Sequence, residues 1–264
     1  MRKKLSVILT GDHEESCSIV AGLVAEVVVR GDVCLGLATG GSMEGVYAEL
    51  RRRHDAEGLS FRSVATVNLD EYVGLEPSHV QSYRHYMDHK LFDHVDIDKA
   101  RTCVPRGTLP RDKMLEEFQG FLDSRPRDLQ LLGLGSNGHI GFNEPAPFFA
   151  PWAHVVTLEE GTRRDNQRFF SSLDEVPSQA VTMGIGDILN AARIVLLVHG
   201  PSKAEPLRAL LQDDRVCPEV PCTALKLHPD VVVVVDRGLA RLAGVEKECA
   251  GLAGEEIDDG QKRR

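Results

Sequence analysis

Short runs of consecutive apolar residues alternate along the chain with longer stretches in which apolar positions recur at helical spacing. Residues 231–235 are all valine, whereas in the stretch 14–29 residues such as Val20 and Val27 fall on one side of a helix. This pattern predicts strands at 5–10, 33–39, 64–70, 129–135, 155–158, 194–198 and 231–236, and helices at 14–29, 43–54, 82–92, 113–122, 162–170 and 203–211.

Continuously apolar strands separated by amphipathic helices are typical of a parallel sheet that is covered on both faces. The sequence therefore predicts an α/β fold: a doubly wound, mostly parallel sheet with helices on both faces, Rossmann-like, with the active site at the C-terminal ends of the strands. A length of 264 residues suits one large domain of this kind or two small ones. With no internal repeat and no long linker, we expect one domain over 1–264, with the charged end 255–264 as a disordered tail.

The charge balance and the cysteines limit the partners and the compartment. A net charge of -9 argues against nucleic acid and membrane surfaces as partners, so positive groups must gather locally if the substrate is anionic. Gly11 and Asp12 interrupt the first apolar run, so we expect no signal peptide, and no run is long enough to span a membrane. The six cysteines form no Cys-x-x-Cys pair and are expected to be reduced thiols in a cytoplasmic protein. The sequence leaves the oligomeric state open, and both a monomer and a homo-oligomer are compatible with it.

Three of the predicted strands end in unusual sequence, and in open α/β sheets ligands bind beyond these ends. The first such end is Thr39-Gly40-Gly41-Ser42, which suits a phosphate because glycines allow close approach, a helix start offers free N–H groups and the hydroxyls can donate. An ordinary glycine turn with Ser42 as the N-cap explains the same residues. If the strands are parallel neighbours, all three ends face one crevice.

The second strand end carries two adjacent carboxylates, Asp70 and Glu71. Neighbouring residues of a strand point to opposite faces, so one carboxylate can enter the crevice while the other pairs elsewhere. A carboxylate at a strand end is a candidate general base, although a surface turn also accommodates such a residue.

The third strand end, 135–145, combines glycines with His139 and Glu144. Gly133, Gly135 and Gly138 match the spacing of a dinucleotide-binding loop, but Pro145 and further breakers exclude the helix that such a loop must open. A carboxylate beside an imidazole orients the ring and raises its basicity, which makes His139 and Glu144 a candidate proton shuttle.

The residues argue against two further kinds of site, a metal site and the site of a serine hydrolase. His79, His85, His89 and His94 suggest a metal, but no carboxylate completes a known ligand pattern, so a solvated helix face is the preferred interpretation and no metal site is predicted. The chain has no Gly-x-Ser-x-Gly elbow, which argues against a serine hydrolase.

Taken together, these strings resemble the signatures of glucosamine-6-phosphate deaminases. The resemblance rests on residues 39–42, on Asn68-Leu69-Asp70-Glu71-Tyr72-Val73-Gly74-Leu75, on Gly138-His139-Ile140-Gly141-Phe142-Asn143-Glu144-Pro145, and on shorter matches at 162–163, 168–170, 202–204 and 227–229. It runs from about residue 5 to residue 236. It implies a hydrolase of amino-sugar catabolism that converts glucosamine 6-phosphate to fructose 6-phosphate and ammonia without a cofactor.

The resemblance also implies roles for individual residues. Asp70 would move a proton between C2 and C1, His139 would assist ring opening, and Glu144 and Asn137 would support it. The phosphate would be held by Thr39, Gly40, Gly41 and Ser42 together with Arg168 and Lys203.

The sequence departs from the family pattern in two places. Met43 stands where relatives often have proline, and the apolar stretch 146–152 directly follows Glu144. Some members of the family are hexamers activated by N-acetylglucosamine 6-phosphate through serines and basic residues near this stretch, and here those positions fall on Pro147, Phe148, His154 and Val156. The alternatives are a 6-phosphogluconolactonase, a galactosamine-6-phosphate deaminase and a sugar-phosphate sensor without catalysis. Intact Asp70, His139 and Glu144 argue against the sensor.

Overall fold

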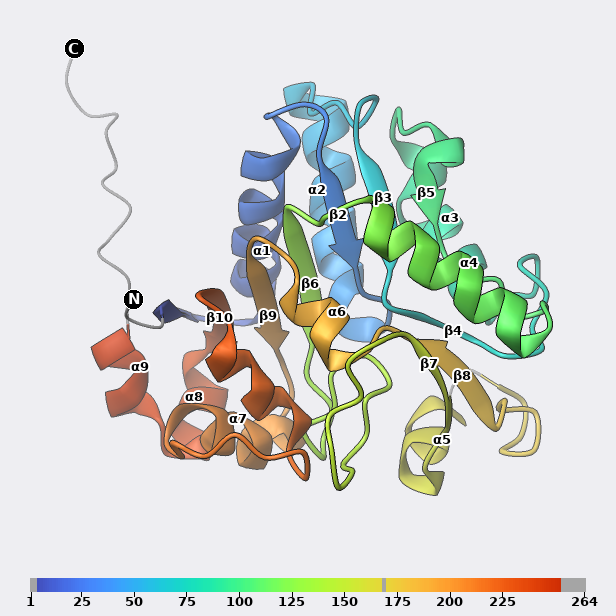
Figure 1. The fold of residues 1–264 in the computed structure, drawn as a ribbon. Helices are drawn as coiled ribbons and strands as arrows, with labels where there is room; N and C mark the ends of the chain where they lie inside the picture. Colours follow the sequence, from blue (N-terminus) through green and yellow to red (C-terminus); the bar gives the residue numbers. More distant parts are fainter. Residues whose placement is uncertain (1–3, 168–169, 253–264) are drawn as a thin grey trace, which may run out of the picture.

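A computed structural model describes residues 4–167 and 170–252, and its centre is a seven-stranded sheet (Figure 1). All neighbouring strands of this sheet are parallel, as the apolar runs predicted. The strands, in spatial order, are β1 (Lys4–Thr10), β10 (Asp230–Asp236), β9 (Ile194–Val198), β6 (Leu129–Gly133), β2 (Cys34–Leu37), β3 (Ala65–Asn68) and β5 (Thr102–Cys103).

Helices cover both faces of the sheet, which explains why its strands are apolar throughout. Figure 1 shows α1 (His13–Val28) and α2 (Glu44–Glu57) on one face, and α4 (Arg111–Ser124) and α6 (Ile185–Leu189) on the other. The valines 231–235 of β10 are all buried between these layers, and burial of each such side chain contributes about 1.5–3 kcal/mol. The remaining helices are α3 (Tyr83–Lys90), α5 (Glu160–Gln167), α7 (Ala204–Leu211), α8 (Arg237–Ala243) and α9 (Glu246–Leu252), with 3-10 turns η1 (Gly41–Met43), η2 (Phe92–His94), η3 (Lys99–Arg101), η4 (Pro201–Lys203) and η5 (Pro221–Leu227).

A second, antiparallel sheet corrects the prediction of one strand over 64–70. The chain leaves the main sheet at Leu69, whose N–H donates to Leu37 O (3.0 Å) of the main sheet while its own carbonyl accepts from Met183 N (2.8 Å). Asp70 is therefore the first residue of a new strand and not the end of the parallel one. The small sheet has the order β4 (Asp70–Tyr72), β8 (Gln179–Thr182) and β7 (His154–Thr157).

The remaining differences concern short elements with weak local patterns. Strands β5 and β8 and helices α6, α8 and α9 were not predicted, because elements of two to seven residues carry too little periodicity. The helix predicted at 162–170 begins earlier, at Glu160, and residues 168–169 lie outside the described residues, as does the expected tail 255–264. Among the described residues, no helix is both long enough and apolar enough to cross a bilayer.

Candidate active site

A cavity of about 630 Å³ opens at the edge of the main sheet where the strands reach their carboxyl ends. The three predicted loops all contribute to its wall, so the expectation that they share one crevice is confirmed. The sequence-predicted residues that line it are Thr39, Gly40, Gly41, Ser42, Asp70, His139 and Lys203.

The loop 39–42 forms one wall of the cavity and leads through η1 into α2. Two tyrosine hydroxyls hold its backbone: that of Tyr47 donates to Ala38 O just before the loop, and that of Tyr86 donates to Gly40 O within it (2.9 Å). Gly40 has a φ of 102°, a conformation that favours glycine. The first N–H groups of a helix lack partners within it, so this turn is a suitable place for an anion.

Lys203 approaches the cavity from a second turn of the same kind. It ends η4, which follows Gly200 with a φ of 95° and opens α7. Two helix starts, after β2 and after β9, thus line one cavity together with a lysine.

Asp70 brings a carboxylate to the cavity wall, although its residue is only 6% exposed. Burial raises the pKa of Asp70 well above its ordinary value, and the charge of Glu71 raises it further. The third loop passes close to this carboxylate, because a Cβ atom added to Gly141 would lie in ordinary van der Waals contact with Asp70 Oδ2, at 3.5 Å.

Glu71 has a different environment from its neighbour. Its Oε1 accepts the N–H groups of Tyr72 (2.8 Å) and Tyr83 (2.9 Å), and its Oε2 accepts that of Arg84 (3.0 Å). Burial raises the pKa of Glu71 to about 7, against the opposing effect of these three hydrogen bonds. The carboxylate therefore joins β4 to the first turn of α3.

Asn137 stands between His139 and Glu144. Asn137 Nδ2 donates to Glu144 Oε2 (2.6 Å), which leaves Asn137 Oδ1 to accept from His139 Nδ1 (2.8 Å) and from His139 N (3.2 Å). The Nδ1 atom also lies 3.4 Å from Glu144 Oε2. These contacts assign the ring proton to Nδ1 and leave Nε2 to exchange protons with a ligand. A side chain at Gly135 would collide with the ring, since an added Cβ would lie 2.4 Å from its atoms.

Glu144 lies at the end of the hydrogen-bonded chain that runs from His139 through Asn137, and it is held in its ionised form. Burial opposes ionisation, but hydrogen bonds and charge from His139, and hydrogen bonds from Thr162 and Asn137, outweigh it and lower the pKa of Glu144. The hydroxyl of Thr162 donates to Glu144 Oε1. A permanent carboxylate beside His139 stabilises the protonated ring, as a proton shuttle requires.

A family model described as glucosamine-6-phosphate isomerases/6-phosphogluconolactonase matches residues 14–234, most of the chain and nearly all of this site. The chain belongs to this family. Curated relatives include a glucosamine-6-phosphate deaminase of Bacillus velezensis, 45% identical over 89% of this chain and 99% of its own, and glucosamine-6-phosphate deaminase 1 of Bacillus subtilis, 46% identical over 87% and 96%.

Solved structures of the family agree with the fold. A structure described as a monomeric glucosamine-6-phosphate deaminase superposes with a TM-score of 0.87 at 44% identity, covering 90% of this chain and 99% of that one. A 6-phosphogluconolactonase from Trypanosoma brucei reaches a TM-score of 0.70 at 16% identity, covering 91% and 99%, which shows the shared fold alone.

Three residues of the site were not singled out by the sequence, and one predicted residue is not described. His13, Tyr83 and His199 line the cavity without having been predicted, and so do Thr162 and Ser202, which belong to the matched strings but were given no role. The strand-end rule finds His13 and His199 when it is applied to β1 and β9, which carry no glycine-rich signature. Arg168, which the resemblance implies as a phosphate ligand, lies outside the described residues.

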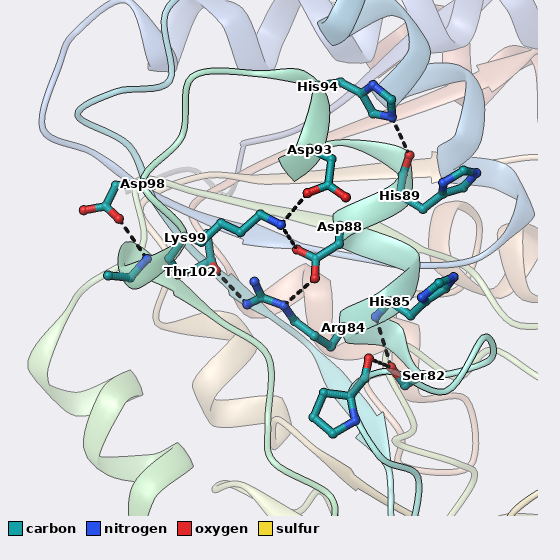
Figure 2. Close-up of polar contacts among 12 residues, drawn as sticks. Ser82, Arg84, His85, Asp88, His89, Asp93, His94, Asp98, Lys99 and Thr102 are labelled. Carbon is teal, nitrogen blue, oxygen red and sulfur yellow. Dashed lines mark hydrogen bonds and ion pairs between the residues drawn. The ribbon is translucent and has the colours of Figure 1, made fainter.

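His85 and His89 on α3 do not line the cavity, and together with His94 of η2 they do not converge as metal ligands. Figure 2 shows His85 and His89 side by side along α3, and His94 Nε2 donates to the carbonyl oxygen of His89 (2.9 Å). Among the residues that the structure describes, no group of three His, Cys, Asp or Glu side chains has the geometry to hold a metal ion.

The charged residues beside these histidines have a structural explanation. Arg84 Nε donates to Asp88 Oδ2 (2.9 Å) and Arg84 Nη1 to Thr102 Oγ1 (2.9 Å), while Lys99 pairs with Asp88 (3.2 Å) and with Asp93 (Figure 2). This network joins α3 to η2, η3 and β5. It lies on the same helix whose first N–H groups donate to Glu71.

Proposed function

We propose that this chain is a glucosamine-6-phosphate deaminase, which converts glucosamine 6-phosphate and water to fructose 6-phosphate and ammonia. The observation that carries the proposal is the buried Asp70 carboxylate in the same cavity as His139, whose ring is linked through Asn137 to Glu144. Relatives with 45% and 46% identity over most of the chain carry the same activity in their names. The role of each residue below is part of the proposal.

The phosphate binds at the wall formed by residues 39–42, and the positive charge of Lys203 balances its negative charge. The N–H groups at the start of η1 and the hydroxyls of Thr39 and Ser42 donate to its oxygens, and the ammonium group of Lys203 makes a charge-assisted contact. The resemblance adds Arg168 to this group. Holding the phosphate at one end positions the sugar carbons C1 and C2 near Asp70.

Ring opening needs a proton on the ring oxygen and the loss of one from the C1 hydroxyl. His139 carries out this transfer through Nε2, because Nδ1 is engaged by Asn137. Glu144 stabilises the imidazolium that forms transiently. The product of this step is the open aldehyde.

Isomerisation follows at C1 and C2. The Asp70 carboxylate removes the proton from C2 to give an enolamine, and the resulting carboxylic acid returns the proton to C1. The nitrogen at C2 becomes an imine, water adds to C2, and ammonia leaves as the C2 carbonyl of fructose 6-phosphate forms. A raised pKa makes the Asp70 carboxylate a stronger base than an exposed aspartate, which suits removal of a proton from carbon.

The cellular setting is part of the same proposal. We infer a cytoplasmic enzyme of amino-sugar catabolism that folds as one domain over residues 1–264. All six cysteines are free thiols and four of them are buried, which supports a reducing compartment.

The test is an ammonia-release assay with glucosamine 6-phosphate, galactosamine 6-phosphate and 6-phosphogluconolactone offered side by side, with lactone hydrolysis followed separately. We expect ammonia and fructose 6-phosphate from the first substrate at the highest kcat/KM. Preference for the galacto epimer would reassign the substrate, and hydrolysis of the lactone alone would reassign the reaction. Binding of the sugar phosphate without turnover would identify a sensor.

A further inference from the structure

Two histidines that are distant in the sequence meet at the rim of the cavity. The rings of His13 and His199 stack with centroids 3.8 Å apart and planes inclined by 20°. His13 is the first residue of α1, and His199 directly follows β9. Both residues line the cavity, and the segment that begins at His199 continues through Gly200 to Lys203 on the same wall.

Ionisable groups surround the pair on several sides. Asp236, at the end of β10, places Oδ2 4.0 Å from His199 Nδ1, while its Oδ1 accepts Leu239 N (2.8 Å) and caps α8. On α1, Cys17 Sγ lies 3.5 Å from His13 Nε2, and Asp12 caps the helix by accepting Glu15 N (2.8 Å). The other ionisable side chains that line the cavity are Lys203, Asp70, Tyr83 and, from the third loop, His139.

The two histidines together can take up one proton, but not two. Burial lowers the pKa of His13 and the adjacent His199 lowers it further, while the carboxylates of Asp236 and Asp12 act in the opposite direction. Two imidazolium rings in stacked contact would repel each other, so only one of them carries a charge at a time. An anion entering the cavity favours the charged form of the pair and thereby draws a proton to it.

We propose that His13 and His199 form part of the phosphate subsite and bind the phosphate of the substrate with uptake of one proton by the pair. The inference rests on the proposed function and extends it, because it adds a titratable positive charge to the fixed charge of Lys203. The chain as a whole is acidic, with a net charge of -9, so such local charge is what an anionic ligand requires. Below neutral pH the pair strengthens phosphate binding, and above it Lys203 acts without this assistance.

Inorganic sulfate is the appropriate probe, because it remains a dianion from pH 6 to pH 8.5 and does not titrate as a phosphate ester does. Its inhibition constant against glucosamine 6-phosphate is measured across that range for the wild type, His13→Gln and His199→Asn. We expect the wild-type constant to rise by about tenfold from pH 6 to pH 8 and to rise clearly less in both variants. All three proteins contain the same His139, so the difference between the slopes reports the pair.

The matched control uses another pair of facing histidines, His85 and His89, whose rings are 6.3 Å apart on α3 (Figure 2). Neither of them lines the cavity, so His89→Gln should keep the wild-type slope. Equal slopes in the wild type, His13→Gln and His199→Asn would overturn the inference. A loss of affinity that is the same at every pH would also overturn it, because it would reveal a structural role alone.

A measurement on the unmodified enzyme removes any dependence on the folding of the variants. The ring signal of His13, assigned by its loss in His13→Gln, is titrated by NMR with and without saturating sulfate. We expect sulfate to move the midpoint of this titration to higher pH, and an unchanged midpoint would contradict the inference. Turnover of saturating glucosamine 6-phosphate by the same samples reports the proposed function independently, so failure of one does not imply failure of the other.

Discussion

The carboxyl groups of Asp70 and Glu71, adjacent on β4, face different surroundings. Asp70 lines the cavity, whereas Glu71 accepts the N–H of its neighbour Tyr72 and those of Tyr83 and Arg84 at the start of α3. The side chain of Glu71 is thus occupied in fixing the strand that carries Asp70. Its negative charge also acts on Asp70, whose pKa burial and this charge both raise. One residue is therefore proposed to react, and its neighbour to position it and adjust its basicity.

Asp70→Asn should abolish turnover while leaving ligand affinity within about tenfold of the wild type, because the lost carboxylate acts mainly in the transition state. The amide is of nearly the same size and leaves the cavity wall in place. Ammonia release measures the turnover, and calorimetric binding of fructose 6-phosphate measures the affinity. Near-normal turnover in this variant would remove Asp70 from the mechanism.

The fall of kcat/KM at low pH should reflect the ionisation of Asp70 beside Glu71. Asp70 must be ionised to act as a base, and its pKa is raised, so kcat/KM should fall on acidification at a higher pH than an ordinary aspartate of pKa about 4 would give. Glu71→Gln removes the neighbouring charge and should move this fall to lower pH by about half a unit to one unit.

Glu71→Gln should also lower the stability of the folded protein. A glutamine amide cannot accept at both positions, so one of the backbone N–H groups that now donate to Glu71, such as that of Arg84, loses its acceptor. We expect a loss of about 1–3 kcal/mol in the free energy of unfolding, measured by urea denaturation. A fall of kcat/KM that stays at the same pH while stability is lost would show that Glu71 acts on structure alone.

Lys203→Ala should weaken substrate binding by about 2–3 kcal/mol, a rise in KM of roughly 30- to 150-fold, as expected for a charge-assisted contact to phosphate. Lys113→Ala, an exposed substitution on α4, provides the matched control for a lost lysine. By the resemblance, Arg168→Ala should behave like Lys203→Ala. Equal processing of glucosamine and glucosamine 6-phosphate by the wild type would refute the phosphate-site assignment.

Tyr86→Phe should raise KM by roughly two- to tenfold and leave kcat unchanged, because the lost hydroxyl supports the phosphate loop and contacts no reacting atom. The hydroxyl of Tyr86 donates to Gly40 O at 2.9 Å, on a carbonyl of the loop that lines the cavity. Steady-state kinetics separate the two constants. A fall in kcat at constant KM would place Tyr86 in the chemical step instead.

N-acetylglucosamine 6-phosphate should not activate this enzyme, and its kinetics should be hyperbolic. Phe148, His154 and Val156 line a separate cavity of about 280 Å³, and Phe148 is 67% exposed. Phenylalanine and valine offer neither charge nor a side-chain donor for a phosphate, and a neutral histidine does not replace an Arg/Lys pair. Rate curves recorded with and without the compound test this, and sigmoidal kinetics that become hyperbolic on its addition would reveal an activator site.

The candidate site was predictable wherever its signal is local. The glycines of 39–42 and of 135–141 indicate tight turns, and the apolar runs before them indicate buried strands. Because such strands form a parallel sheet, the turns that follow them lie at the same edge of it. The opposite directions of the Asp70 and Glu71 side chains follow from the alternation of side chains along a strand. None of these inferences requires knowledge of distant contacts.

The sequence by itself determined the parallel α/β architecture and the loops that surround the cavity, because apolar periodicity and glycine turns act over a few residues. Only the tertiary structure decided that the chain leaves the main sheet at Leu69 and that Asp70 begins a strand of the second sheet, since this depends on Met183 reaching it. The stacking of His13 on His199 was likewise decided by packing, because it needs β1 and β9 to be placed on either side of β10. Contacts between distant segments are selected by the whole sheet, and no local pattern encodes them.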